Sequence, residues 1–435
     1  MQIAIFILTL ILVIWQPRGL SMGFSPLGGA LLALITGIVT WQDVATVWGM
    51  VWNATLTAIA LIIISRILDA AGFFRGLALW LAHAGLGRGR LFFVLLMVLG
   101  ALLTANLSNY GTALIWTPTL MEMLLLLGFS SKATFALVFA TGFIADATSL
   151  PLSTSNLVNL ISTDYFNISF FRYLLVMIPV NFVAIATGTG VIWFYFDRYI
   201  PFTYNLDRMP PPDSVIRDPL VCQWSFAVLG SLLIGYFLAQ PLGIPVSSIA
   251  VSGALVMLAI SGRWFHQDNT AILSLRKVWC EIPWSVLGFS LGMSILALSW
   301  RNTELTTLLS QLLKQLSGWG LTQVAMGTGF LATLLSGVMN NIPAVLINSL
   351  AIQDVLGIDS SVREVMMYAN VIGCDLGGKI TPIGSLSTLL WLNILARQGR
   401  PIAWEQYIRI AFIVTLPVLS VSLLGLAIWL PWLIV

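Results

Sequence analysis

The chain has 435 residues, of which 58% are hydrophobic and only 9% are charged, and its formal net charge at pH 7 is +3. Soluble domains carry roughly 25% charged residues, so this composition excludes a soluble globular protein. The small, scattered net charge gives no indication of nucleic-acid binding. Three cysteines with no paired spacing predict neither a disulfide framework nor a metal cluster, and nothing in the sequence indicates a cofactor.

Apolar runs fill nearly the whole chain and predict an all-α polytopic membrane protein. They cover residues 2–16, 24–40, 48–65, 91–108, 110–127, 133–163, 171–196, 222–239, 243–260, 283–299, 321–337, 340–352, 363–395 and 405–433. At about 20 residues per crossing, the chain suits roughly ten to twelve spans. The first run, Ile3 to Trp15, lacks a basic leader and a small-residue cleavage site, so we expect a first span rather than a signal peptide.

Basic residues orient these spans, because they gather in alternate loops. They are Arg18, Arg66, Arg75, Arg88, Arg90, Lys132, Arg198, Arg208, Arg217, Arg263, Arg276, Lys277, Arg397 and Arg400. The positive-inside rule puts their loops in the cytoplasm and leaves both termini outside. This orientation requires segments 91–127 and 321–352 each to return to the side from which they entered.

Those two segments are either re-entrant hairpins or pairs of full crossings. The polar residues Asn109 and Asn340 lie where each segment would turn. Irregular backbone at membrane depth is tolerated only where it is buried in protein or lines a cavity. At about 1.5 Å of rise per residue, the leg 340–352 is too short to cross alone. We therefore expect hairpins.

The order of elements predicts two inverted repeats. Each half has three spans, a hairpin, one interrupted span and a last span, and five crossings per half would invert the second half relative to the first. The first repeat covers 1–197, with hairpin 91–127 and broken span 133–163. A proline-rich cytoplasmic linker covers 198–219. The second repeat covers 220–435, with hairpin 321–352 and broken span 363–395.

Polar cassettes occupy matching places in the two halves. Asn109 precedes Asp146 by 37 positions, and Asn340 precedes Asp375 by 35. Glycine and proline break the two long spans, and the broken ends expose backbone donors and acceptors. The nearby hydroxyls and amides either bind a small polar solute or satisfy the freed backbone. The expected solute-binding residues are Asn109, Tyr110, Thr148, Ser149, Ser155, Asn156, Asn340, Asn341, Thr381 and Ser385.

Two carboxylates and one lysine are the candidates for proton coupling. Low dielectric favours the neutral acid, so Asp146 or Asp375 could carry a proton through the membrane. Lys379 follows Asp375 by four residues and would pair with it in a continuous helix. A structural ion pair is the alternative reading of Asp375 and Lys379. Asp146 has no cation in its own cassette and is the preferred carrier.

At these residues the chain resembles the ArsB family of arsenite and antimonite efflux permeases, within the ion transporter superfamily. The resemblance rests on VWNAT at 51–55, GFIAD at 142–146, SLPL at 149–152, SNLVN at 155–159, MNN at 339–341, ANVIGCDLG at 369–377 and KITPIGSL at 379–386. Family members have Asn-Asp-Gly at the first hairpin tip, whereas this chain has Asn109-Tyr110-Gly111, which removes an acid there.

The resemblance implies a secondary transporter, not an enzyme, in the bacterial inner membrane. It implies export of arsenite and antimonite, as neutral trivalent hydroxides, in exchange for protons, in some members with a soluble ATPase partner. Hydroxyls and amides suit a neutral trihydroxy solute, and neither cassette contains arginine. The alternatives are a sodium/proton antiporter or an oxyanion or dicarboxylate carrier, although an anion carrier would be expected to use more cationic groups.

Overall fold

The computed structural model describes residues 1–16, 22–207, 209–264, 282, 284–301 and 304–434. The basic residues Arg18, Arg208, Arg276 and Lys277, which contributed to the predicted orientation, lie outside this part of the chain. That orientation, including external termini, stays a prediction.

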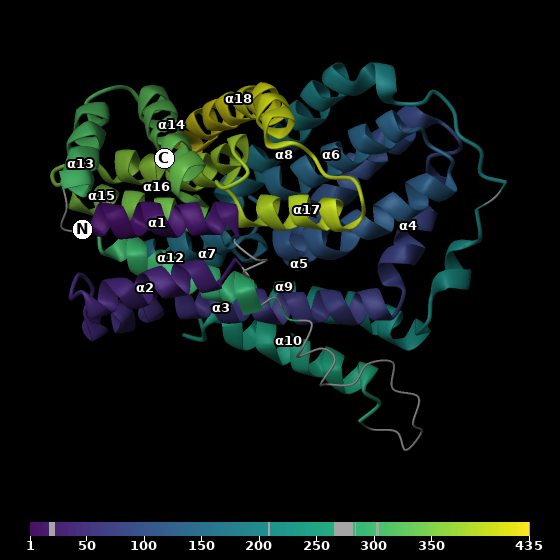
Figure 1. The fold of residues 1–435 in the computed structure, drawn as a ribbon, viewed down its shortest axis with the longest axis horizontal. Helices are drawn as coiled ribbons and strands as arrows, with labels where there is room; N and C mark the ends of the chain where they lie inside the picture. Colours follow the sequence, from purple (N-terminus) through teal and green to yellow (C-terminus); the bar gives the residue numbers. More distant parts are fainter. Residues whose placement is uncertain (17–21, 208, 265–281, 283, 302–303, 435) are drawn as a thin grey trace.

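The described residues form helices joined by short connections (Figure 1). The first half contains α1 (Gln2–Trp15), α2 (Phe24–Ile35), α3 (Trp41–Ala70), α4 (Phe73–Ala84), α5 (Gly89–Leu126), α6 (Ser131–Ala147), η2 (Ser153–Ser155), α7 (Leu157–Phe166), α8 (Phe170–Phe196), η3 (Asp197–Tyr199) and η4 (Pro212–Val215). The second contains α9 (Pro219–Ala239), α10 (Val246–Ser261), α12 (Trp284–Leu298), α13 (Glu304–Ser317), α14 (Leu321–Met339), α15 (Asn341–Asp354), α16 (Ser360–Gly377), η5 (Gly378–Ile380), α17 (Leu386–Arg397), α18 (Trp404–Trp429) and α19 (Pro431–Ile434).

The all-α membrane architecture predicted from the sequence is confirmed. Six of the described helices are long and apolar enough to cross a bilayer, and five shorter apolar helices accompany them. The long ones are Trp41–Ala70, Gly89–Leu126, Phe170–Tyr199, Pro219–Ala239, Leu321–Met339 and Trp404–Leu433. The inverted relation of the halves and the boundaries 1–197, 198–219 and 220–435 stay predictions.

Helix starts follow ordinary capping chemistry. Thr40 and Asp43 form a capping box at the start of α3, and the Ser169 side chain caps α8. Asp218 caps α9 and is followed by Pro219 in the first turn, where the absence of a proline N–H costs nothing. These caps satisfy backbone donors that no intrahelical partner can reach.

Each half contains a helix break of the same shape. Inside α5, Ser108 has φ 67° and ψ 156°, and between α14 and α15, Asn340 has φ 81° and ψ 153°. Matching the two breaks by this left-handed residue pairs Ser108 with Asn340, and Asn109 with Asn341, one position away from the pairing of Asn109 with Asn340 that the sequence suggested. The correspondence, like the repeat, stays a prediction.

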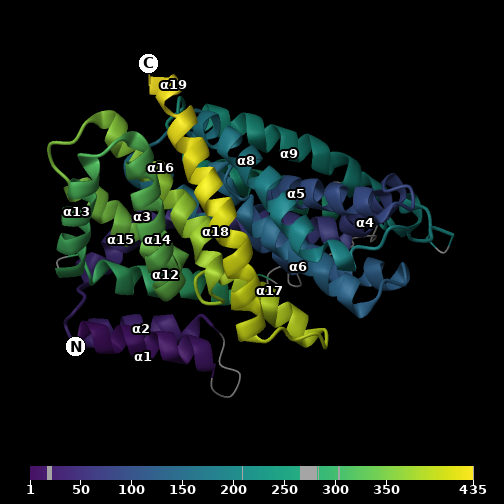
Figure 2. The same ribbon diagram turned by 90° about the horizontal axis from the view of Figure 1, so that it is seen from above.

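Long helices from both halves pack around the two broken spans. α14 lies against α16, and α18 lies against both α8 and α16. Figure 2 shows α18 crossing the middle of the molecule, with α1 and α2 along one side. The half-helix α17 packs on α5, and α7 packs on α15. Each broken span therefore contacts an element of the other half, and this brings the two polar cassettes together.

Candidate functional site

The two spans expected to be broken are interrupted at their polar centres. α6 ends at Ala147, η2 follows at Ser153–Ser155, and α7 begins at Leu157. α16 ends at Gly377, η5 follows at Gly378–Ile380, and α17 begins at Leu386. Asp146 lies in the last turn of α6 and Asp375 in the last turn of α16. Both aspartates are therefore fixed by a helix on one side and face irregular backbone on the other.

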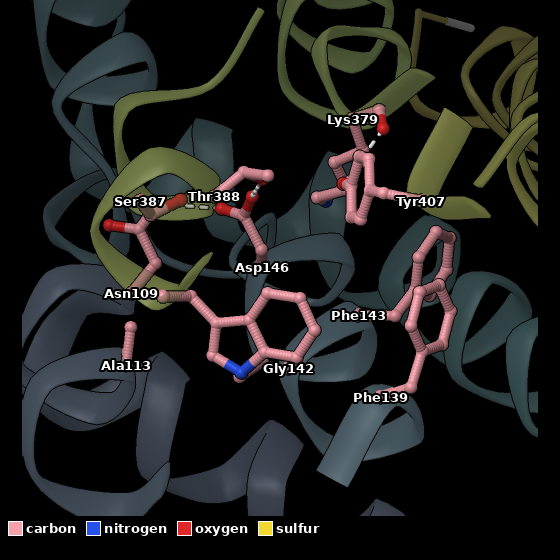
Figure 3. Close-up of a pocket in the computed structure, with 12 residues that line it drawn as sticks. Asn109, Ala113, Phe139, Gly142, Phe143, Asp146, Lys379, Ser387, Thr388 and Tyr407 are labelled. Atoms are coloured by element: carbon pink, nitrogen blue, oxygen red, sulfur yellow. Dashed lines mark hydrogen bonds between the residues drawn. The ribbon is translucent and has the colours of Figure 1, made fainter. Parts of the chain in front are cut away.

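Asp146 is surrounded by neutral hydrogen-bond donors. Asn109 Nδ2 donates to Asp146 Oδ1 at 2.8 Å, and Asn109 comes from the break in α5. Ser385 and Thr388 donate to Asp146 Oδ2 at 3.0 and 3.3 Å. Ser387 Oγ is 3.4 Å from Asn109 Nδ2. Asp146 thus joins the first hairpin to the α17 end of the second broken span (Figure 3).

Asp375 is held by side chains of the first broken span. Ser149 Oγ is 2.7 Å from Asp375 Oδ2, and Asn156 Nδ2 is 2.5 Å from Asp375 Oδ1. Asn156 also accepts from Val158 N–H and so caps α7 with its other side-chain atom. Asp375 itself is fully buried.

The contacts of the two aspartates are reciprocal. Asn156 is the N-cap residue of α7 and donates to Asp375, whereas Ser385 is the N-cap residue of α17 and donates to Asp146. Each carboxylate is therefore bound by the residue that begins the second half-helix of the other broken span. A helix N-terminus favours negative charge, so both places suit an ionised carboxylate.

Lys379 does not pair with Asp375. Its Nζ has no hydrogen-bond partner among the described residues, and the side chain is 1% exposed. The ammonium lies 5.8 Å from the centre of the Phe143 ring, a cation–π contact. The expected pair required a continuous helix, but α16 ends at Gly377 and Lys379 lies in a 3₁₀ turn, where the four-residue spacing no longer aligns side chains.

A small cavity has both Asp146 and Lys379 on its wall. Its volume is about 20 Å³, enough for roughly one water molecule. Its wall consists of Asn109, Ala113, Phe139, Gly142, Phe143, Ala145, Asp146, Lys379, Ser387, Thr388, Trp391 and Tyr407. Figure 3 shows Asn109 and Thr388 beside Asp146, with Lys379 next to Tyr407. We call this the central cavity.

Three buried polar atoms on the cavity wall have no hydrogen-bond partner among the described residues. They are Asn109 Oδ1, Lys379 Nζ and Trp391 Nε1. Buried polar atoms are nearly always hydrogen-bonded, so three unpaired polar atoms on one wall are candidates to contact a bound solute. One acceptor and two donors around one space suit a small hydroxylated molecule.

Other expected solute-binding residues lie away from the cavity wall and bond within the protein. Thr148 donates to Ile144 O, Ser155 to Ala105 O and Thr381 to Gly337 O. Asn340 donates to Ile383 O and caps α15. These four residues satisfy backbone freed by the breaks.

Two further expected residues at the hairpin tips are buried without a described partner. The Tyr110 hydroxyl and both polar side-chain atoms of Asn341 are unbonded among the described residues. Neither residue is on the wall of the central cavity.

The expected binding residues did not include the aromatic part of the wall. Phe139, Trp391 and Tyr407 come from α6, α17 and α18. Trp391 follows Ser387 by four residues and therefore lies on the same face of α17. The four-residue spacing from Ser387 could have indicated that Trp391 lies at the site. It was not used, because an aromatic residue in an apolar helix ordinarily packs against its neighbours.

The whole chain is similar to a known protein family in sequence and to a solved transporter in structure. The family described as arsenical pump membrane protein, ArsB, matches residues 1–430. The arsenical pump membrane protein of Yersinia enterocolitica is 49% identical over 98% of this chain and 97% of its own length. That of Escherichia coli K12 is 48% identical with the same coverage. The solved structure of the Alcanivorax borkumensis YdaH transporter has the same fold, with a TM-score of 0.59 and 15% identity over 89% of this chain and 88% of that chain.

Proposed function

The chain belongs to the ArsB family of arsenical pump membrane proteins and is an arsenical efflux transporter, and on this premise we propose that it exports arsenite and antimonite in exchange for protons. The solute is the neutral trivalent hydroxide, the site is the central cavity, and Asp146 carries the proton. We place the protein in the bacterial inner membrane, with the basic loops in the cytoplasm.

The balance of buried charge is the observation that supports proton coupling. The buried charged residues among those described are Asp146, Asp218, Asp375 and Lys379. Asp218 is neutralised by Arg263 at 2.9 Å, which leaves two carboxylates and one ammonium at the centre. A buried net charge of minus one is costly in low dielectric. Uptake of one proton makes the total charge of Asp146, Asp375 and Lys379 zero. These three side chains together are therefore suited to bind and release a proton.

Access decides which carboxylate takes that proton. Asp146 is on the wall of the central cavity, whereas Asp375 is not and is fully buried behind Ser149 and Asn156. A proton can reach Asp146 through the same space that admits the solute. We therefore assign the coupling proton to Asp146 and a structural, charge-balancing role to Asp375 and Lys379.

Hydrogen-bond chemistry makes solute and proton compete at Asp146. An ionised carboxylate only accepts, so it can bind a hydroxyl group of the metalloid, with Asn109 Oδ1 accepting a second hydroxyl. A protonated carboxyl donates from one oxygen and loses an acceptor there. Protonation from the more acidic outer side therefore releases the solute, and loss of the proton to the cytoplasm restores the site.

The cavity must widen to hold the metalloid, because it admits roughly one water molecule in the closed form described. The lining hydroxyls and amides remain suited to a neutral solute. A weak, reversible site of this kind is what transport requires, since tight capture would prevent release.

Proton flux in everted membrane vesicles tests the proposal. Vesicles from a host without its own arsenite exporter are acidified inside by respiration, and a pH-sensitive dye reports proton exit. We expect arsenite and antimonite each to accelerate proton exit, and a protonophore, which collapses both the pH gradient and the membrane potential, to abolish solute accumulation. Accumulation that follows an imposed sodium gradient in the presence of the protonophore would show that the alternative sodium-coupled carrier is correct. We propose that the chain alone supports this basal activity and that a soluble ATPase, where present, adds to it.

A further inference from the structure

Three aromatic rings from three helices meet on the wall of the central cavity. The Phe139 ring centre is 6.0 Å from that of Trp391 and 6.0 Å from that of Tyr407. Trp391 and Tyr407 are 6.3 Å apart. Each of the three side chains is almost fully buried. We call this set the aromatic triad.

A second, larger cavity lies one helical turn farther along the same helices. Its volume is about 220 Å³, and its wall includes Phe135, Val138, Leu395 and Gln406. Phe135 precedes Phe139 by four residues on α6, and Leu395 follows Trp391 by four on α17. Residues four apart lie one above the other on a helix face. Both helices thus lead from the break, past the triad, to this second cavity.

The second cavity has polar groups and a basic edge. Ser131, Thr134, Gln406 and Arg400 are on its wall. The Thr134 hydroxyl is buried and has no partner among the described residues, so it is free to bind a polar solute. Arg400 belongs to a loop that the positive-inside rule assigns to the cytoplasm. This is the side from which an exported solute arrives.

We propose that the second cavity is the cytoplasmic vestibule for the metalloid and that the aromatic triad is the gate between the vestibule and the central cavity. This inference rests on the proposed direction of transport, because the vestibule is an entrance only for export. The gate does not depend on that direction, because the three side chains would block passage of a solute either way.

The three rings differ in how firmly they are held. The Tyr407 hydroxyl donates to Lys379 O at 2.9 Å, and the Phe139 ring is supported by Phe196 at 5.8 Å between ring centres. Trp391 Nε1 has no described partner. A Cβ on Gly142 would lie 2.4 Å from Trp391 Cε2, so only glycine leaves room for the indole there. Because Trp391 Nε1 lacks the hydrogen bond that the Tyr407 hydroxyl has, the proposed gate moves at Trp391.

Thiol accessibility from the cytoplasmic side tests the gate without any transport assay. In a background with the three native cysteines replaced by serine, Ala113→Cys reports on the central cavity and Ser131→Cys on the vestibule. A charged methanethiosulfonate reagent is added to everted vesicles, whose cytoplasmic face is outward. We expect Ser131→Cys to react rapidly and Ala113→Cys to be protected.

Removal of the gate ring should expose the central cavity. We expect Trp391→Ala to accelerate labelling of Ala113→Cys at least tenfold. Phe143→Ala is the matched control, because Phe143 is also an aromatic wall residue but is outside the triad, and it should leave Ala113→Cys protected. Elution of each variant as a single sharp peak from a size-exclusion column in detergent shows that the protein is folded, and unchanged labelling of Ser131→Cys shows that the vestibule is unaltered.

Two results would overturn the gate. One is rapid labelling of Ala113→Cys with the triad intact. The other is continued protection of Ala113→Cys in both Trp391→Ala and Phe139→Ala while Ser131→Cys still reacts. The assay uses neither arsenite nor a proton gradient, so a failure of the proton-exchange proposal leaves its result readable. Rapid reaction of Ser131→Cys only from the opposite membrane face would reverse the assigned direction and leave the gate standing.

Discussion

The break after Asp146 and the break after Asp375 have the same order of elements but different surroundings. Asp146 is on the wall of a cavity and accepts bonds from Asn109, Ser385 and Thr388. Asp375 is sealed by two side chains. The comparison teaches that two helix breaks of the same layout can each place an acid and still leave only one of the two acids on a cavity wall.

Helix packing explains why the second break is closed. A Cβ on Gly373 would lie 2.2 Å from the Gly329 carbonyl oxygen, and one on Gly377 would lie 2.2 Å from Thr333 Oγ1. α16 therefore approaches α14 at backbone contact, as small residues permit in membrane helices. On the first break, Gly142 instead makes room for an indole ring. The second break is packed against backbone, and the first against a side chain that can move.

The largest difference is expected between Asp146→Asn and Asp375→Asn. Asp146→Asn removes the accessible acid, so arsenite accumulation driven by the pH gradient in everted vesicles should fall to background. Downhill arsenite exchange should survive. Asp375→Asn removes a buried acceptor and should reduce the amount of folded protein, while the transport that remains keeps its pH dependence. Uphill transport by Asp146→Asn at the normal rate would assign the proton elsewhere.

Two glycine substitutions should separate rigid from adaptable packing. Gly373→Ala places a Cβ against backbone, and overpacking of this kind costs about 1–3 kcal/mol, so thermal stability in detergent should drop clearly. Gly142→Ala displaces only the Trp391 ring, so the protein should remain stable while arsenite transport falls roughly tenfold.

Gly190→Ala is the control for both glycine substitutions, because nothing lies within 4 Å of its Cβ position. Equal losses of stability in Gly373→Ala and Gly142→Ala would contradict the contrast between the two breaks.

The reciprocal N-cap contacts should be unequal in strength. Asn156→Ala leaves Asp375 with Ser149 alone and also removes the side-chain cap of α7; loss of a hydrogen bond to a charged group costs about 1.5–3 kcal/mol, and loss of the cap adds about 1 kcal/mol. Ser385→Ala leaves Asp146 with Asn109 and Thr388, so its cost should be smaller, about 1 kcal/mol. Chemical or thermal unfolding of the two variants side by side measures the difference, and the reverse order would show that Asp375 is satisfied by other groups.

The smallest effect is expected at Cys374, although it lies next to Asp375. Its thiol is fully buried, is 3.4 Å from Asn370 Oδ1, and is not on the wall of the central cavity. Cys374→Ser should therefore retain most arsenite resistance in a sensitive host, as should Cys222→Ser as a control. Loss of resistance in Cys374→Ser at normal membrane expression would identify the thiol as a metalloid ligand.

Sequence reasoning succeeded where a local rule was sufficient. Both broken spans were located, because glycine, proline and several hydroxyl residues cluster together in the middle of each long apolar run, whereas a single proline, such as Pro179 in α8, leaves its helix continuous. The positions of Asp146 and Asp375 at the two breaks followed for the same reason. The helix breaks lie within one residue of Asn109 and Asn340, where the sequence placed the turns, since the left-handed residue is Ser108 in one half and Asn340 in the other. That the two segments are re-entrant hairpins stays a prediction.

By itself, then, the sequence determined the membrane class, the family, the two breaks and the two acids, because apolar length and polar interruption are properties of contiguous residues. Only the tertiary structure decided that Ser385 contacts Asp146 and Asn156 contacts Asp375, that Lys379 does not pair with Asp375, and that Phe139, Trp391 and Tyr407 meet on the cavity wall. Those contacts join residues from different helices. Their existence depends on how half-helix ends meet across the two halves of the chain, which spacing along one helix does not specify.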